Sequence, residues 1–170
     1  CRTVINYTKS EAEARATLQE CDKHGTEALL VRANVAEDAD CRRMAEAALA
    51  KWGRIDALVN NAGTTKVAFN HADLSALSAA DFQHVYGVNV VGAFQMIRAV
   101  EPAMRKQGGG AVVNVSSIAA VMGIGTSVAY AASKGALNTM TLSLARALGP
   151  QIRVNAVCPG FVETRWLQEG

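Results

Sequence analysis

The sequence has little net charge, no closely paired cysteines and no uninterrupted apolar run long enough to cross a membrane. Its 17 Lys and Arg residues exceed its 15 Asp and Glu residues by two, and the basic residues are scattered along the chain. This balance argues against a nucleic-acid partner or an acidic membrane surface. The four cysteines include no C-x-x-C pair, so we expect reduced thiols in a cytoplasmic protein rather than a zinc site or a disulfide scaffold.

The most apolar stretch, residues 111–132, is interrupted by Asn, Ser, Thr and Tyr residues, and the N-terminus has no signal-peptide pattern. We therefore expect no membrane partner. Half of the residues are apolar, which is enough for a sizeable core, and no linker or internal repeat divides the chain. A length of 170 residues then indicates one domain over residues 1–170.

Short β-branched runs alternate with long helical patterns along the chain. Several of these runs are apolar almost throughout, which is typical of strands buried on both faces of a parallel sheet. With helices crossing between them, the strands predict an α/β sandwich. We expect strands at residues 3–7, 28–31, 55–59, 112–115 and 152–157, and helices at residues 10–24, 37–52, 81–107 and 130–148.

Three local signals concern the helices. Ser10 followed by Glu13 matches a capping box, and Ser78 before Asp81 suits a second helix start. Pro102 lies inside the helix expected at residues 81–107, and we expect it to kink or break that helix.

Parallel α/β sheets bind ligands beyond the carboxyl ends of their strands, near the point where the strand order reverses. The segments at or just after the expected strand ends can therefore line one crevice. These segments are Asn6-Tyr7, Asn34-Val35, residues 60–63, Ser116-Ser117 and residues 158–164.

Tyr130 and Lys134 are four residues apart on an expected helix, so their side chains share a face. A free phenol has a pKa near about 10 and is a poor acid-base catalyst at neutral pH. A neighbouring ammonium favours the phenolate, so we expect Lys134 to lower the pKa of Tyr130. The spacing alone is more typical of an ordinary surface or packing pair, because Y-x-x-x-K occurs by chance in many helices.

Other polar positions have two interpretations each. Ser116 and Ser117 end a strand, where a hydroxyl can donate to a substrate oxygen or satisfy its own backbone. Asn89 lies in a helical stretch, where Asn is a mediocre residue, and its side chain can serve a site or bond a nearby carbonyl. The small residues 61–63 suit either a plain turn or a close approach of backbone to a cofactor.

Taken together and in order, these motifs resemble the short-chain dehydrogenases/reductases, particularly members similar to 3-oxoacyl-(acyl-carrier-protein) reductase. The resemblance spans essentially all of the chain. The matching motifs are Asn60-Asn61-Ala62-Gly63, Asn89 within Val88-Asn89-Val90-Val91-Gly92, Ser116-Ser117, Tyr130-Ala131-Ala132-Ser133-Lys134, Ile152-Arg153-Val154-Asn155 and Pro159-Gly160-Phe161-Val162-Glu163-Thr164.

The resemblance implies a Rossmann-type doubly wound parallel sheet in a three-layer sandwich, and it implies a role for each catalytic residue. Tyr130 would be the acid that protonates a carbonyl oxygen, or the base in the reverse direction. Lys134 would hold the nicotinamide ribose beside Tyr130. Ser117 would polarise the carbonyl, with Ser116 as the less favoured neighbour, and Asn89 would position a water in the proton relay.

The resemblance also implies which residues contact a nicotinamide cofactor, which would carry the hydride. The adenosine half would be contacted by Asn61, Ala62 and Gly63, with Asn34 and Val35 near the adenine. The nicotinamide carboxamide would be bound by Val162 and Thr164, which follow Pro159 and Gly160. Position 34 is Asn where family members commonly carry Asp.

The family's first strand, its glycine-rich T-G-x-x-x-G-x-G turn and its last strand are absent from this sequence. In the strand order 3-2-1-4-5-6, the absent first strand would lie between residues 3–7 and 55–59. We therefore expect a gap with unpaired backbone on both sides, a longer natural protein and poor binding of pyrophosphate by these residues alone.

The expected function is NAD(P)H-dependent interconversion of a carbonyl and a secondary alcohol, with a 3-oxoacyl thioester as the favoured substrate. A sugar or alcohol dehydrogenase of the same family remains open, and so does a catalytically silent nucleotide-binding scaffold.

Two further expectations concern the cofactor and the assembly. The end of the strand at residues 3–7 carries no carboxylate until Glu11, so a 2′-phosphate would not be repelled there, and NADP(H) is favoured over NAD(H). The helices at 81–107 and 130–148 carry apolar residues, and in similar proteins such helices pair with symmetry mates. We therefore expect a homotetramer.

Overall fold

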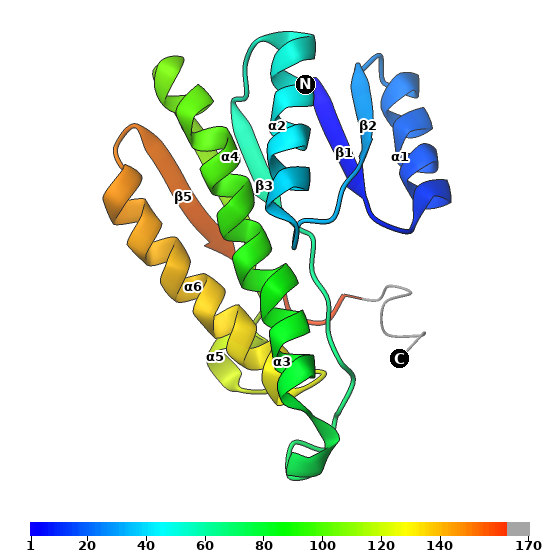
Figure 1. Cartoon of the computed structure of the whole chain (residues 1–170), viewed down its shortest axis with the longest axis vertical. Helices are drawn as coiled ribbons and strands as arrows, with labels where there is room; N and C mark the ends of the chain where they lie inside the picture. Colours follow the sequence, from blue (N-terminus) through cyan, green and yellow to red (C-terminus); the bar gives the residue numbers. More distant parts are fainter. Residues whose placement is uncertain (163–170) are drawn as a thin grey trace.

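The computed structural model describes residues 1–162, in which parallel strands alternate with helices (Figure 1). Thr164, one of the expected cofactor contacts, lies outside these residues. The strands are β1 (Thr3–Tyr7), β2 (Ala28–Arg32), β3 (Ala57–Asn60), β4 (Gly110–Val115) and β5 (Ile152–Val157). The helices are α1 (Glu11–Lys23), α2 (Asp38–Trp52), α3 (Ala79–Tyr86), α4 (Ala93–Lys106), α5 (Ala119–Met122) and α6 (Val128–Leu148), with a 3₁₀ turn η1 (Leu74–Ala76) and a π-helical segment η2 (Gly87–Gly92).

The described strands form two parallel sheets rather than one. β1 pairs with β2, and β4 lies between β3 and β5. A cavity of about 750 Å³ separates the two sheets and is lined by residues of β1 on one side and of β3 on the other. The predicted gap between these two strands is therefore confirmed.

Helices α2 and α4 pack against each other and hold the two sheets together. One core of buried residues runs through β2, α2, α4, β4 and β5, and includes Val31, Met44, Ile97, Met104 and Ile152. Because this core spans both sheets, the sheets are fixed relative to each other although no strand joins them.

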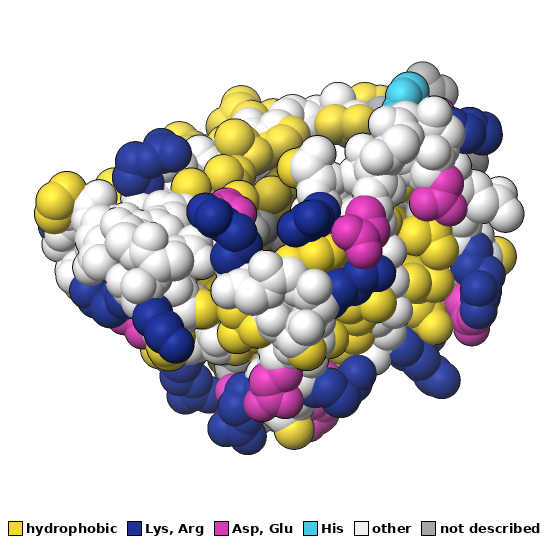
Figure 2. All heavy atoms as spheres, turned by 90° about the horizontal axis from the view of Figure 1, so that it is seen from above, with side chains coloured by type: hydrophobic (Ala, Val, Ile, Leu, Met, Phe, Trp, Pro, Cys, Tyr) yellow, Lys and Arg dark blue, Asp and Glu magenta, His cyan; other side chains and the backbone are white. Residues whose placement is uncertain are grey.

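Residues of β5 alternate between buried and exposed along most of the strand, so one face of β5 packs in the core and the other faces solvent. Figure 1 shows α4 and α6 on the same side of β3 and β5. On these strands Val59 and Val157 remain 61% and 47% exposed. The α/β class with parallel strands is confirmed, whereas burial on both faces does not extend to these residues. Hydrophobic side chains also reach the surface between charged ones when the molecule is viewed from the amino ends of the strands (Figure 2).

The helix signals in the sequence had different outcomes. The helix start predicted at Ser78 is confirmed, and the structure adds that Ser78 caps α3 in a complete capping box with Asp81. The capping box expected at Ser10 is wrong, because Ser10 has a ψ of 60°, outside the extended conformation that side-chain caps adopt, and makes no capping hydrogen bond.

The helix predicted at residues 81–107 changes from α- to π-helical hydrogen bonding at η2, and it does not break at Pro102. Pro102 lies inside α4, where neighbouring residues such as Val100 and Met104 are buried. Proline removes one backbone hydrogen bond. The packing of α4 against the core outweighs that loss, so the helix continues. None of the helices in residues 1–162 is both long and apolar enough to span a bilayer.

Candidate active site

Tyr130 and Lys134 lie on the same face of the first turns of α6. The Ser127 hydroxyl caps this helix by accepting a hydrogen bond from the Tyr130 amide at 3.1 Å. The Lys134 ammonium lies 5.6 Å from the centre of the Tyr130 ring and donates to the Val115 carbonyl at 2.7 Å. Both side chains are buried, so the pair is held by α6 and by the end of β4.

Burial determines the pKa values of this pair. Burial raises the pKa of Tyr130, and a hydrogen bond with Ser117 lowers it by less. The predicted lowering by Lys134 is therefore wrong for this chain, because removal of the phenolate from water outweighs the stabilising contacts. Burial also lowers the pKa of Lys134 to about 8, with a smaller opposing effect from the nearby Cys158.

The two serines at the end of β4 have separate contacts. The Ser116 hydroxyl is buried and donates to the Lys134 carbonyl at 3.2 Å, so it packs α6 against β4. The Ser117 hydroxyl accepts from the Ala119 amide at 3.1 Å and is hydrogen-bonded to the Tyr130 side chain. Ser117 is thus the serine that faces the phenol.

Asn89 lies in the π-helical segment η2 and is buried. Its carboxamide accepts from the Thr64 amide at 2.8 Å and donates to the Thr64 carbonyl at 3.0 Å. Single π-helical turns inside α-helices occur frequently at functional sites. Asn89 here fixes the start of the loop that follows the 60–63 segment.

Ser133 was not singled out by sequence reasoning. Its buried hydroxyl accepts from the Asn89 carboxamide at 2.9 Å and donates to the Tyr130 carbonyl at 2.7 Å. It therefore links η2 to the turn of α6 that carries Tyr130. The available signal was a serine three residues after the tyrosine, where it can bond back within the helix.

The segment at residues 61–63 is exposed and reaches the Lys134 side chain. A Cβ atom on Gly63 would lie 3.5 Å from Oδ1 of Asn89 and 3.7 Å from Nζ of Lys134. The missing side chain leaves room beside the ammonium, so backbone and ligand can approach it closely.

Asn34 and Val35, expected near the adenine, order their own loop in this structure. The Asn34 amide donates to the Asp40 carboxylate at 2.7 Å, and its side chain accepts from the Ala36 amide at 3.1 Å. Val35 is buried, and a Cβ atom on Gly92 would come within 2.8 Å of it. These contacts hold the end of β2 against η2.

The segment after β5 lies beside the segment that follows Ser117. The Ile118 amide donates to the Pro159 carbonyl at 3.0 Å, and a Cβ atom on Gly160 would lie 3.8 Å from the Ile118 side chain. Val162 is 57% exposed next to it. The two strand ends that carry Ser117 and Pro159 are thereby brought together.

A second feature that sequence reasoning missed is a buried polar chain. Asn60 donates to Asn114 at 2.9 Å, and Asn114 donates to Thr141 at 2.9 Å. The two asparagines are direct partners in the β3–β4 register, and Thr141 lies on α6. Two Asn residues in otherwise apolar strands were the available signal. The chain ties the site's two central strands to its helix.

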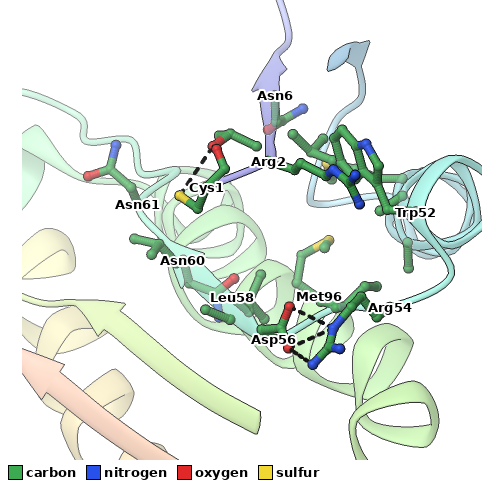
Figure 3. Close-up of a pocket in the computed structure, with 18 of the residues that line it drawn as sticks. Cys1, Arg2, Asn6, Trp52, Arg54, Asp56, Leu58, Asn60, Asn61 and Met96 are labelled. Carbon is green, nitrogen blue, oxygen red and sulfur yellow. Dashed lines mark hydrogen bonds and ion pairs between the residues drawn. The ribbon is translucent and has the colours of Figure 1, made fainter. Parts of the chain in front are cut away.

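The cavity between the sheets is distinct from this cluster. Its lining includes Asn60, Asn61 and Ala62 but none of Ser117, Tyr130 or Lys134. Figure 3 shows Asn6 and Asn60 on opposite sides of it, with the Arg54–Asp56 ion pair toward one end. We interpret it as the space for the absent strand and not as a substrate pocket. No group of three or more potential metal ligands occurs within residues 1–162.

Known proteins resemble this chain in sequence over nearly its whole length. The family model described as short chain dehydrogenase matches residues 1–169. The chain belongs to the short-chain dehydrogenase family. The resemblance to this family that the sequence motifs indicated is therefore confirmed.

Three relatives illustrate the range of this short-chain dehydrogenase's similarities. It is 43% identical over 167 residues (98% of the chain) to the Streptomyces violaceoruber protein named "Granaticin polyketide synthase putative ketoacyl reductase 2". It is 36% identical over 164 residues (96% of the chain) to the 3-oxoacyl-[acyl-carrier-protein] reductase of Synechocystis sp.. A structure of gluconate 5-dehydrogenase from Burkholderia cenocepacia in complex with NADP and tartrate matches with 30% identity and a TM-score of 0.84, covering 98% of this chain and 64% of that one. The chain spans 65% of the length of each of the first two relatives.

Proposed function

We propose that this short-chain dehydrogenase reduces the carbonyl of a 3-oxoacyl thioester with NADPH, and oxidises the alcohol in reverse. The observation that carries the proposal is the convergence of the Tyr130 phenol, the Ser117 hydroxyl and the Lys134 ammonium at the carboxyl end of β4. Two relatives with ketoacyl or 3-oxoacyl reductase in their names support the choice of substrate.

Tyr130 would act as the proton donor. NADPH, when bound, would supply the hydride for the carbonyl carbon. The Tyr130 O–H bond would break as its proton passes to the carbonyl oxygen, which would give the alcohol and leave a phenolate to be reprotonated from water. Its raised pKa keeps the phenol protonated at neutral pH, as a donor requires. Ser117, already hydrogen-bonded to the phenol, would donate to the same oxygen and hold the carbonyl in place.

Lys134 would hold the ribose of the nicotinamide half. An ammonium has three N–H donors, and the Val115 carbonyl occupies one of them. The remaining two can reach ribose hydroxyls across the space that Gly63 leaves open. Pro159, Gly160 and Val162 lie on the neighbouring strand end and are proposed to border the nicotinamide.

Asn89 is proposed to position the relay water through its backbone carbonyl. Its side-chain oxygen and nitrogen already bond Thr64 and Ser133, so the carboxamide is engaged in holding the site together.

NADPH is proposed over NADH because of the groups at the end of β1. Asn6, where an acid would repel a 2′-phosphate, donates to the Ala33 carbonyl at 2.9 Å. Lys9 and Arg32 are exposed at this strand end, and the Arg32 guanidinium donates to the Thr8 carbonyl at 3.3 Å. A 2′-phosphate gains from such basic neighbours. The similarity to a structure that contains NADP agrees with this choice.

A sugar or alcohol dehydrogenase is the second candidate, supported by the similarity to gluconate 5-dehydrogenase. We also propose that residues 1–170 act as one catalytic domain, and that the protein is a homotetramer. Val91 of η2 and Phe94 of α4 remain 48% and 41% exposed, which supports an interface there. The four cysteines are free, in keeping with the proposed reducing cytoplasm.

The function is tested with the full-length protein, by following oxidation of NADPH and of NADH in the presence of acetoacetyl thioester, 5-ketogluconate and a simple ketone. We expect the highest kcat/KM with NADPH and the thioester. Higher efficiency with 5-ketogluconate would favour the second candidate. Tight NADPH binding with no turnover of any carbonyl would favour a silent scaffold.

A further inference from the structure

Two loops meet beside the proposed proton donor, one that follows β3 and one that precedes α6. The Ala68 amide donates to the Thr126 carbonyl at 2.7 Å, and the hydroxyls of Thr65 and Thr126 lie 2.6 Å apart. The third contact joins Nε2 of His71 to the Gly125 carbonyl at 3.2 Å. A carbonyl oxygen only accepts hydrogen bonds, so the His71 ring is the donor. Of these three contacts, only that of His71 reaches Gly125.

Gly125 lies against the ring of Tyr130. A Cβ atom on Gly125 would lie 3.6 Å from this ring and 3.3 Å from Cβ of Ala119, so there is no room for a side chain between the Gly125 backbone and the ring. The backbone at Gly125 therefore forms one wall of the space that the Tyr130 ring occupies, and a shift of that backbone changes the positions open to the ring.

The loop at residues 123–127, which contains Gly125, has little restraint of its own. Gly123 and Gly125 both have positive φ values, of +66° and +116°. Glycine has more backbone freedom than any other residue, so this part of the loop depends on outside contacts to stay against the ring. The hydrogen bond from His71 supplies such a contact at the residue that lies against the ring.

His71 itself lies in an ordered turn. The His71 amide donates to the Phe69 carbonyl at 3.1 Å. Two residues further on, the Asp73 carboxylate caps the 3₁₀ turn η1 by accepting from the Ser75 amide at 3.0 Å. The chain on both sides of the His71 ring is therefore fixed before any substrate arrives, which lowers the entropy lost when the ring holds Gly125.

We propose that His71 is a positioning residue for Tyr130, because its hydrogen bond to the Gly125 carbonyl keeps the loop at residues 123–127 against the ring. This inference rests on the proposed role of Tyr130 as the proton donor. His71 acts through Gly125 and not on the substrate. Without the bond, the loop leaves the ring in a fraction of the molecules, and the ring turns away from its hydrogen bond with Ser117. Fewer molecules then have the donor in place when the hydride is transferred.

The experiment compares His71→Leu, which has similar bulk but no donor, with His71→Gln, whose amide nitrogen lies near the position of Nε2. The full-length variants are assayed with NADPH and the carbonyl that the wild type reduces best, by the single-turnover rate of NADPH oxidation. A single neutral hydrogen bond makes a modest contribution, so we expect His71→Leu to slow this rate by about 3- to 10-fold with the NADPH Kd unchanged. His71→Gln should return the rate to within about twofold of wild type.

The matched control is His84→Leu, the same change at an exposed histidine of α3, and it should leave the rate within about twofold of wild type. A second variant, Gly125→Ala, strains the backbone at a positive φ and crowds Ala119, so it should move the loop and slow the rate as well. Because both changes act through one loop, the double variant His71→Leu/Gly125→Ala should lose less than the product of the two single effects.

The rates and the NADPH Kd together decide the role of His71. A rate within about twofold of wild type for His71→Leu overturns that role, and so does a His71→Gln rate as low as that of His71→Leu. A rise in the NADPH Kd that accounts for the lost rate also overturns it, because the loop would then act on cofactor binding. Single effects of His71→Leu and Gly125→Ala that multiply would show that the two residues do not act through one loop. A wild type that binds NADPH but reduces no carbonyl would overturn the proposed function, and the positioning role with it.

Discussion

Two regions proposed to contact the cofactor differ in their packing: the start of α6 and the space between β1 and β3. At the start of α6, the polar side chains around Tyr130 are tied to one another and to β4, η2 and the loop at Thr64. Between β1 and β3, a cavity of about 750 Å³ stands where a parallel strand would fit. The comparison teaches that the contacts which hold the Tyr130 side chain and its neighbours do not involve the residues that line this cavity.

The largest expected effect lies at the start of α6. Tyr130→Phe keeps the ring packing but removes the proton donor, and positioned acid-base groups typically contribute about 10²- to 10⁴-fold. We expect kcat of the full-length protein to fall by that range while the NADPH Kd changes little. Retention of more than about a tenth of wild-type kcat, with chemistry rate-limiting, would show that another group donates the proton.

A substitution of Lys134 should affect both cofactor binding and the chemical step. Lys134→Ala removes both the ribose contact and the charge beside Tyr130, and a hydrogen bond to a charged group is worth about 1.5–3 kcal/mol. We expect the NADPH Kd to rise by roughly 10- to 100-fold and kcat to fall as well. A variant that loses kcat alone would limit Lys134 to the chemical step. Isothermal titration and steady-state kinetics on the same preparation provide the two values.

Stability should also distinguish the two regions. Asn114→Ala leaves Asn60 and Thr141 without their shared buried partner, which costs about 1–3 kcal/mol. The matched control Asn155→Ala, on the same sheet but exposed in β5, should change the free energy of unfolding by less than about 0.5 kcal/mol. Urea denaturation measures both. Equal losses would mean that the buried chain adds nothing specific.

The smallest expected effect is that of pH on cofactor binding. Burial lowers the pKa of Lys134 to about 8, so the ammonium is present below that pH and is lost as pH rises through it. We expect the NADPH Kd to rise about twofold from pH 7 to pH 8, because about half of the ammonium is then deprotonated. Lys134→Ala should show no such rise. A wild-type Kd that is flat over this interval would contradict the assigned role.

Local spacing predicted that Tyr130 and Lys134 share one face of a helix. The strand order and the gap were predicted from the resemblance to the short-chain dehydrogenases, and periodicity alone gave only the α/β class. Sequence patterns were less informative elsewhere. They failed where tertiary context decides. The α4 helix continues through Pro102 because its neighbours pack in the core. Burial raises the pKa of Tyr130, and residue spacing carries no information on burial. Ser133 and the Asn60–Asn114–Thr141 chain connect residues from separate elements, so a linear pattern could not identify them.

The central claim is that Tyr130 donates the proton when NADPH reduces a carbonyl substrate at this site. The most direct test incubates the full-length protein with acetoacetyl thioester and NADPH carrying deuterium at the transferable position, and analyses the product by mass spectrometry. The account predicts a 3-hydroxyacyl thioester with one deuterium on the former carbonyl carbon, formed in equal amount to the NADPH consumed. Bound NADPH with no deuterated alcohol would contradict it.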